Sequence, residues 1–361
     1  MFTASYGDIM NSTLEVTDDP EYPTYDYDSV TKSPPSVSGP QCRETICVIT
    51  VILKVIIFLL GIVGNGAVIW IAGFKMKKSV NTTWYLSLAI SDFIFCSTLP
   101  ITIVHTVTNN WSFGLFMCKF ASFVMFLNMY SSIFILVIIS VDRCLTVKFP
   151  VWAQNHRSVV KASVVVALTW LMSVLLSIPP LKFRETGTVK FIETGIVKKT
   201  LGCYNEYGGH HNHLTAVFLR FSLAFLIPLL SICFCYSILI CKLRANQLSK
   251  SNKPYKIMTL LIVTFFLCWV PFHIVAMIEF GASKGSETFK DAIYSAQRIT
   301  ATLAISNSCL NPFLYAFMAK DLKKKCYSFL SKIESAIDEE TRSGFKGTSI
   351  TSAGDRLSTA V

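Results

Sequence analysis

Seven long apolar segments constrain what this 361-residue chain can fold into. A helix needs about 20 mostly apolar residues to cross a bilayer, and each segment reaches that length. In hydrocarbon the backbone can satisfy its hydrogen bonds only in a helix or a closed barrel, and the segments lack the strict alternation of barrel strands. We therefore predict an all-α membrane protein, a seven-transmembrane helix bundle with spans at residues 47–73, 82–104, 116–148, 159–179, 213–241, 255–279 and 292–317.

The positions of the basic residues predict the orientation of the bundle. The loops at residues 74–81, 143–158 and 242–256, and the stretch after residue 318, are rich in Lys and Arg. By the positive-inside rule they are cytoplasmic, which places the amino terminus outside the cell. The loop at residues 181–212 also carries lysines, but it is long and mixed with acidic residues, so it receives less weight. We expect a multi-pass protein of the plasma membrane.

The composition along the sequence divides the chain into four regions. Residues 1–47 hold eight acidic and two basic side chains, and we expect residues 1–46 to be a disordered, acidic extracellular tail. The bundle follows at residues 47–317, then a short amphipathic eighth helix on the inner-leaflet lipid at 318–331, then a disordered cytoplasmic tail at 332–361. The net charge of +11 is spread over several loops, so nucleic acid is not an expected partner.

Several residues outside the spans are candidates for modification. Sequons at Asn11 and Asn110 lie on the expected outer side and predict N-glycosylation. Tyr22, Tyr25 and Tyr27 lie among acidic residues, a setting that suits sulfation. The alternative for this tail is a merely solubilising role.

Two further features lie at opposite faces of the expected bundle. Cys326, in the amphipathic segment, is a candidate for palmitoylation. In the second outer loop, residues 184–190 (RETGTVK) are echoed at 192–198 (IETGIVK). Their alternation and two glycines predict a β-hairpin lying over the bundle.

Asp92, near the middle of the second span, needs a physical explanation. An ionisable side chain at that depth costs about 2.5–3.5 kcal/mol on insertion scales. Asn128, Ser132, Asn307 and Asn311 lie at depths that let them converge on Asp92. One carboxylate with several neutral oxygens suits a small hard cation, so we predict an allosteric Na⁺ and no other cofactor. The alternative is a hydrogen-bonded network that holds the helices together.

Arg220 lies about two turns inside the fifth span from the outer side. A guanidinium there can bind a ligand carboxylate through two hydrogen bonds, and we predict this role. The alternatives are that Arg220 extends outward to the membrane surface or pairs with Glu279. No nucleophile–base set and no cluster of metal ligands within the spans indicates an enzyme.

A set of motifs in a fixed order resembles one receptor family. The motifs are Gly64-Asn65, Leu88 with Asp92, Cys118, Asp142-Arg143-Cys144, Trp170, Pro228, Tyr236, Phe265-x-x-Cys268-Trp269-x-Pro271 and Asn311-Pro312-x-x-Tyr315. Over residues 47–330 the chain therefore resembles the rhodopsin-like G-protein-coupled receptors.

The resemblance implies a disulfide and a contact with the G protein. Cys118 and Cys203 resemble the pair that ties the third helix to the second outer loop. Arg143 resembles the arginine that contacts the G protein in the active state and is held at rest by Asp142. Cys144 stands where this triplet usually has tyrosine, a variant found among chemoattractant receptors.

The resemblance also implies moving parts. Trp269 and Phe265, beside the kink expected at Pro271, resemble the packing switch under the ligand. Tyr236 and Tyr315 resemble the tyrosines that help to hold the cytoplasmic cavity open.

Shorter phrases narrow the resemblance to the chemoattractant branch. Residues 150–158 (PVWAQNHRS), 111–114 (WSFG) and 307–312 (NSCLNP) resemble chemerin and formyl-peptide receptors, most closely the chemokine-like (chemerin) receptors. Phe126 stands where formyl-peptide receptors carry an acidic residue, which counts against a formylated ligand.

This likeness implies a chemoattractant peptide or small protein as ligand, with an inhibitory-type G protein and arrestin as partners. We expect the ligand to contact Arg220, His105, Phe126, Phe272, His273, Glu279, Gln297 and Arg298. The alternatives are a receptor for formyl peptides or complement fragments, and a scavenger that binds chemoattractant without signalling. The intact motifs at Asp142-Arg143 and Asn311-Pro312 argue against the scavenger, and the absence of inverted repeats argues against a transporter.

Overall fold

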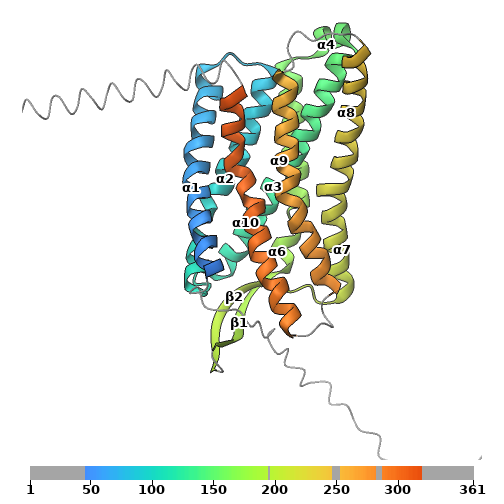
Figure 1. Ribbon diagram of the computed structural model, residues 1–361. Coiled ribbons are helices and arrows are strands. Elements are labelled where there is room, and N and C mark those ends of the chain that lie inside the picture. Colours follow the sequence, from blue (N-terminus) through green and yellow to red (C-terminus); the bar gives the residue numbers. More distant parts are fainter. Residues whose placement is uncertain (1–44, 194–195, 246–252, 282–286, 319–361) are drawn as a thin grey trace, which may run out of the picture. The chain divides into compact units, whose positions relative to one another are not determined.

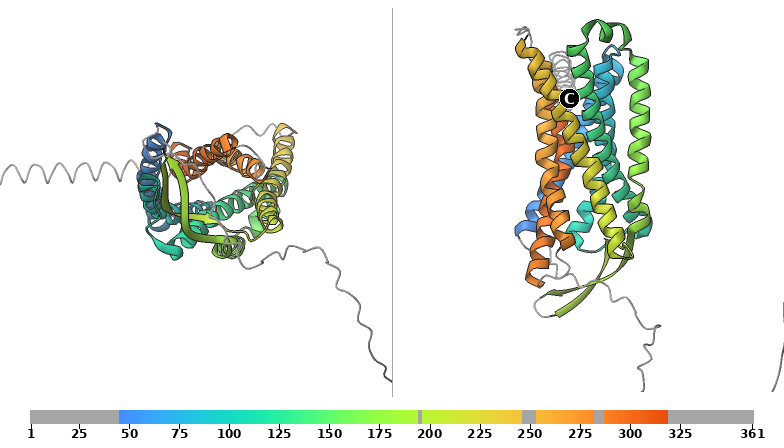
Figure 2. Two further views of the ribbon diagram at one scale, coloured as in Figure 1. Left: turned by 90° about the horizontal axis from the view of Figure 1, so that it is seen from below. Right: turned by 90° about the vertical axis from the view of Figure 1, so that its right-hand side faces the viewer.

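The computed structural model describes residues 45–193, 196–245, 253–281 and 287–318, and in these ranges long helices run side by side (Figures 1 and 2). Both tails and the expected amphipathic helix beyond Met318 lie outside the described residues. So do the candidates for modification in those segments, which are Asn11, Tyr22, Tyr25, Tyr27 and Cys326.

The observed helices agree with the predicted spans. They are α1 (Thr45–Trp70), α2 (Val80–Thr108), α3 (Gly114–Lys148), α4 (Pro150–His156), α5 (Val159–Leu176), α6 (Pro179–Phe183), α7 (His210–Phe221), α8 (Ile227–Ala245), α9 (Lys253–Gly281) and α10 (Glu287–Met318). The fourth span ends earlier than expected, at Leu176, because Pro179 and Pro180 have no N–H with which to continue that helix.

Two π-helical turns interrupt the α-helices. The turn η1 (Ile71–Lys75) ends α1, and η2 (Ser222–Leu226) joins α7 to α8, so that α7, η2 and α8 form one long helix. Such turns insert an extra residue into the helical ladder and are frequent at functional sites. The turn η2 begins two residues after Arg220 and therefore changes which face the following residues present.

The long helix α10 is less apolar than the other long helices of the bundle. Among the described residues, six helices are long and apolar enough to cross a membrane, and α10 is not one of them. Gln297, Arg298, Asn307 and Asn311 make α10 more polar than its neighbours. Its place in the bundle is nevertheless that of a span, since it packs along both α1 and α9.

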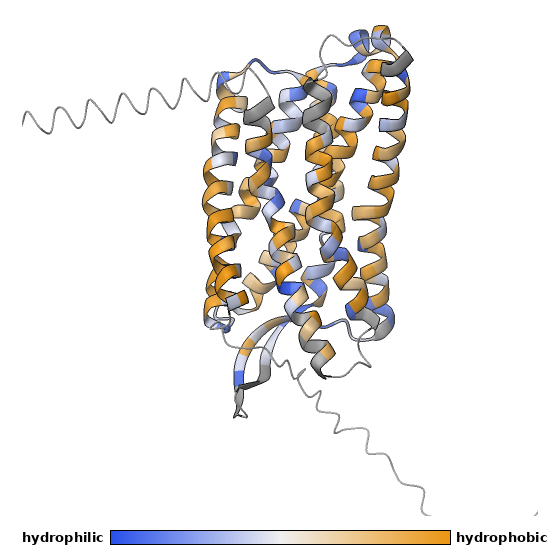
Figure 3. Cartoon of the chain, in the orientation of Figure 1, coloured by the Kyte–Doolittle hydropathy of each residue, from blue (hydrophilic) through white to orange (hydrophobic). Residues whose placement is uncertain are grey.

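The core of the bundle lies around α3. Of its apolar segment, 72% is buried, against 50% or less in the other five apolar helices. It contacts α2, α5, α8 and α9. The helices around α3 are largely apolar (Figure 3), and many of their large apolar side chains, such as those of Val63, Val160 and Leu230, are exposed, as a lipid-facing surface requires.

A two-stranded sheet covers one end of the helices. Strands β1 (Arg184–Glu193) and β2 (Ile196–Asn205) are antiparallel, from the pair Arg184 and Asn205 to the pair Glu193 and Ile196. The predicted hairpin is thus confirmed, and it extends seven residues further than expected, to Asn205. We call this end of the bundle the hairpin end and the opposite end the α4 end (Figure 1).

Candidate functional site

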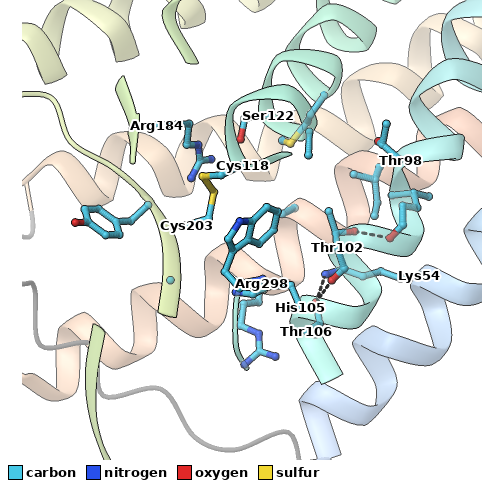
Figure 4. A pocket seen from close by; sticks show the side chains of 18 of the residues that line it. Lys54, Thr98, Thr102, His105, Thr106, Cys118, Ser122, Arg184, Cys203 and Arg298 are labelled. Carbon is cyan, nitrogen blue, oxygen red and sulfur yellow. Dashed lines mark hydrogen bonds between the residues drawn. A yellow bond between two sulfur atoms is a disulfide. The ribbon is translucent and has the colours of Figure 1, made fainter. Parts of the chain in front are cut away.

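A cavity of about 430 Å³ lies at the hairpin end, between α1, α2, α3, α10 and the hairpin (Figure 4). Its volume falls within the usual range of small-molecule sites. Apolar side chains form much of the lining, among them Phe95, Leu99, Met125 and Ile305.

The charges of the cavity have one sign. Lys54 of α1, Arg184 of β1 and Arg298 of α10 all line it, whereas no Asp or Glu is among the described residues of the lining. The Lys54 ammonium donates to Thr106 Oγ1 over 2.8 Å, and Arg298 Nη2 lies 2.9 Å from Cys47 Sγ. Cations gathered in a partly apolar cavity favour an anionic group on whatever enters it.

Arg184 is the least satisfied of these cations. Its Nε is buried and has no hydrogen-bond partner among the described residues. Burial lowers the pKa of this guanidinium, and the charge of nearby Arg220 acts in the same direction, while Tyr207 and Glu279 oppose it. An anion at this position would relieve the repulsion and satisfy the donor.

Strand β2 forms one wall of the cavity, through residues 200–204. The predicted disulfide between Cys118 and Cys203 is confirmed and ties this strand to α3, with the two Cα atoms 5.8 Å apart. An ion pair between Lys119 and Glu185, 3.4 Å long, ties β1 to the same helix. The wall is therefore fixed to the bundle at two adjacent positions of α3.

The residues predicted to contact ligand fall into two groups. His105, Gln297 and Arg298 line the cavity. The second group surrounds Arg220, whose guanidinium carbon lies 5.3 Å from the ring centroid of Phe126 and 5.6 Å from that of Phe272.

The group around Arg220 lies outside the lining of the cavity. His273 belongs to it, is 3% exposed, and packs on Phe221 and Phe225. Glu279 is exposed and, in the described structure, forms no ion pair with Arg220. The contact of these residues with ligand stays a prediction.

An aromatic stack continues from this second group into the core. The ring centroids of Phe272 and Trp269 lie 5.7 Å apart, and those of Trp269 and Phe265 lie 6.0 Å apart. Trp269 is 2% exposed and Phe265 is fully buried. Pro271 lies inside α9 beside them. A displaced Phe272 would therefore disturb two tightly packed rings.

Asp92 lies at the centre of a buried polar network. Its Oδ1 accepts from Asn128 Nδ2 over 2.8 Å, and its Oδ2 accepts from Asn311 Nδ2 over 2.7 Å. Ser132 lies one turn from Asn128 on α3, and Asn307 lies one turn from Asn311 on α10. Ser132 Oγ and Asn307 Oδ1 are buried without a hydrogen-bond partner among the described residues. A carboxylate and neutral oxygens are the kinds of ligand that Na⁺ takes, so the Na⁺ site stays a prediction. The hydrogen bonds from the two amides support the alternative of a hydrogen-bonded network.

The α4 end holds a cluster around Asp142. Arg157, just after α4, donates to both carboxylate oxygens over 2.7 and 2.9 Å. Arg143 Nη2 lies 3.7 Å from the same carboxylate and instead donates to Asn81 Oδ1, which also accepts from Arg157. The predicted contact between Asp142 and Arg143 is therefore present but secondary to one that the sequence did not indicate.

Of the two tyrosines predicted at this end, one can be located. The hydroxyl of Tyr236, on α8, accepts from Thr259 Oγ1 of α9 over 3.2 Å. The side chain of Tyr315 lies outside the described residues.

Comparisons with known proteins agree with this arrangement. The family model "7 transmembrane receptor (rhodopsin family)" matches residues 64–315. The human "Chemerin-like receptor 1" is 38% identical over 341 residues, which cover 89% of this chain and 87% of that protein.

Two other chemoattractant receptors are similar over most of their length. The "C3a anaphylatoxin chemotactic receptor" of Oncorhynchus mykiss is 38% identical, with 85% of this chain and 83% of that protein covered. The mouse "Formyl peptide receptor 2" is 35% identical, with 81% and 86% covered. The chain therefore belongs to the rhodopsin family of seven-transmembrane, G-protein-coupled receptors, in the group that holds the chemerin-like, C3a and formyl peptide receptors.

Proposed function

We propose that this receptor binds the carboxyl terminus of a chemoattractant peptide or small protein, of the chemerin or C3a kind. One observation supports this most directly: three cations from three elements line one cavity, and the described lining carries no acid. A peptide with an unmodified carboxyl terminus carries a carboxylate there, and an arginine can bind it through two hydrogen bonds.

The hairpin end then faces the outside of the cell and the α4 end faces the cytoplasm. Acidic residues predominate in the tail before α1, and basic residues in the loops at the α4 end, which supports this orientation. An anionic tail, with or without sulfated tyrosines, would raise the encounter rate with a ligand that is basic elsewhere on its surface.

Signalling in this proposal is a shift between two arrangements of the bundle. A ligand moves the equilibrium only by the difference in its affinity for the two arrangements. Phe272, Trp269 and Phe265 all lie on α9, and their stack runs from the second ligand group into the core. It can therefore transmit that difference along α9 towards the α4 end. Opening at the α4 end would release Arg143 to an inhibitory-type G protein, and arrestin would bind later.

A binding experiment tests the carboxylate contact. Cells expressing the chain are treated with carboxyl-terminal peptides of chemerin and C3a, each as free acid and as amide, and with a formylated peptide. We expect a free-acid peptide to suppress cyclic AMP, and its amide to bind at least tenfold more weakly, because a hydrogen bond to a charged group contributes about 1.5–3 kcal/mol.

The variant Arg184→Gln should remove most of the difference in affinity between the free-acid peptide and its amide. Lys199→Gln is the matched control, since Lys199 is exposed, lies on the same hairpin and does not line the cavity. Equal affinity for acid and amide in the parent receptor would refute the carboxylate contact. A response to the formylated peptide alone would favour the formyl-peptide alternative.

A further inference from the structure

The loop between α2 and α3 forms a short bridge with the outer edge of β2. The backbone N–H of Trp111 donates to the carbonyl of Leu201 over 2.7 Å. In return, the backbone N–H of Leu201 donates to the side-chain oxygen Oδ1 of Asn110 over 3.0 Å. Leu201 is thus held from the side opposite to its partner strand.

Strand β2 needs such a bridge because it has only one neighbouring strand. In an antiparallel pair, the N–H and C=O of every second residue point away from the partner. Both polar groups of Leu201 are used by the loop, so Leu201 is one of these outward residues. The Asn110 oxygen supplies the acceptor that a third strand would otherwise give.

Local contacts fix the Asn110 side chain in place. Thr108 Oγ1 donates to the Asn110 carbonyl over 3.0 Å, and Asn110 Nδ2 donates to Ser112 Oγ over 3.1 Å. Trp111 is 3% exposed, and its indole N–H donates to the Gly114 carbonyl over 2.8 Å. The loop therefore offers Oδ1 to β2 from a position set by its own hydrogen bonds.

We propose that Asn110 is a positioning residue for the ligand cavity, and that its side-chain oxygen sets the position of β2. Residues 200–204 of β2 line the cavity on one side, and the disulfide holds the strand only at Cys203. The bond at Leu201 is a second fixed point, two residues away. The disulfide and the pairing with β1, which the ion pair to Lys119 ties to α3, hold this segment from one side. The bond at Leu201 holds it from the edge that β1 leaves open.

This role is separate from the sequon to which Asn110 belongs. A glycan would be attached to Nδ2, so Oδ1 can accept from Leu201 whether or not a glycan is present. The two roles can therefore be separated by substitution. Asn110→Asp removes the sequon and keeps an acceptor at this position, whereas Asn110→Ala removes both.

Hydrogen–deuterium exchange on the full-length receptor in detergent, without ligand, measures the bond directly. We expect Asn110→Ala to speed exchange at the Leu201 amide about fivefold or more, since the loss of one hydrogen bond is worth about 1 kcal/mol. Asn110→Asp should exchange like the parent, because its carboxylate oxygen can still accept from the Leu201 amide. Unchanged exchange at buried amides of α3, such as Ile133, shows that each variant is folded.

Two outcomes of the exchange experiment would overturn the proposal. Parent-like exchange at Leu201 in Asn110→Ala would show that the oxygen does not hold the strand. Equal acceleration in Asn110→Asp would assign the effect to the sequon or to the amide group, and not to the oxygen.

The consequence for ligand rests on the proposed function and is measured separately. For the chemerin carboxyl-terminal peptide, Asn110→Ala should speed dissociation while Asn110→Asp does not. If the parent receptor binds none of the peptides, the proposed ligand is wrong, but the exchange result still decides the role of Asn110. If the peptide binds and dissociates at the parent rate from Asn110→Ala, β2 does not depend on Asn110 for ligand binding, which refutes the positioning role.

Discussion

Arg157 binds both carboxylate oxygens of Asp142, through Nε at 2.7 Å and Nη2 at 2.9 Å, whereas the Arg143 guanidinium is 3.7 Å from that carboxylate. An arginine that bonds to both oxygens of a carboxylate is held more strongly than one with a single long contact. In this arrangement Arg157 competes with Arg143 for Asp142, and Arg143 is held mainly through Asn81.

We predict that Arg157→Gln lowers basal signalling. The Asp142 side chain is only 12% exposed and would lose its main partner, so it would pair more closely with Arg143 and hold that residue at rest. A change of about 1 kcal/mol in this balance alters the active population roughly fivefold. Basal nucleotide exchange on an inhibitory-type G protein, in membranes containing the receptor, measures the change.

Two variants serve as comparisons for Arg157→Gln. Asp142→Asn should have the opposite effect, because it weakens the hold on Arg143 instead of strengthening it. Lys161→Gln removes an exposed positive charge four residues away and should change nothing. If Arg157→Gln instead raises basal exchange, Arg157 is part of the resting lock and not a competitor.

We predict that Na⁺ lowers agonist affinity through Asp92. An ion bound between the carboxylate, Ser132 and Asn307 would hold α2, α3 and α10 in the resting arrangement. Agonist affinity in NaCl should therefore be below that in choline chloride of the same ionic strength. Asp92→Asn should remove the difference, and an undiminished difference in that variant would place the ion elsewhere.

The sequence predicts the membrane helices well because the bilayer leaves the backbone few alternatives. The limits of the first span, for example, follow from the length of the apolar segment alone. Asp92, Asn128 and Asn311 could be grouped because the rise per residue of a helix gives the depth of each in the membrane. The hairpin was also predictable, since the echo at residues 184–198 carries the alternation of a strand.

The pairings between distant segments could not be predicted in the same way. Arg157 lies in a basic loop, where an arginine is usually solvated, and only the folded loop brings it to Asp142. Arg184 looked like one of several charges of a long loop. The sequence indicates the position of Arg184 only indirectly. Arg184 pairs across the hairpin with Asn205, which lies two residues from Cys203. Because the disulfide at Cys203 ties β2 to α3, it also brings Arg184 to the cavity. Lys54 is open to the same interpretation as Arg220, because a charged residue within a span either meets a partner or extends to the membrane surface.

We predict that Cys203→Ser weakens both stability and ligand binding. The disulfide to Cys118 closes a segment with a sequence separation of 85, and removing such a bond typically costs about 2–5 kcal/mol. It also releases one of the two fixed points of β2. Thermal unfolding in detergent and binding of the chemerin peptide measure the two effects.

Cys233→Ser is the matched control for this change. Cys233 is exposed and not disulfide-bonded in the described structure, so the same substitution there should alter neither quantity. A parent-like midpoint of unfolding in Cys203→Ser would contradict a stabilising role for the bond.

We predict that Gly61→Ala destabilises the contact between α1 and α2. A Cβ atom at Gly61 would lie 2.3 Å from Cys96 Sγ and 3.2 Å from Cys96 Cβ, so the Cys96 side chain or one of the helices must shift. Overpacking of this kind typically costs about 1–3 kcal/mol. The midpoint of thermal unfolding of the purified receptor should therefore fall.

Two further variants, at Gly66 and at Cys96, test whether the effect of Gly61→Ala comes from the close approach of α1 to α2. Gly66→Ala is the control on the same helix, because a Cβ there would meet only the Phe93 ring, at 3.5 Å, which is ordinary contact. Adding Cys96→Ala to Gly61→Ala removes the sulfur atom and should restore most of the lost stability, since the volume added on α1 is then removed from α2. If the double variant is no more stable than Gly61→Ala alone, the effect of the alanine is not steric, and the packing of α1 against α2 does not depend on this pair.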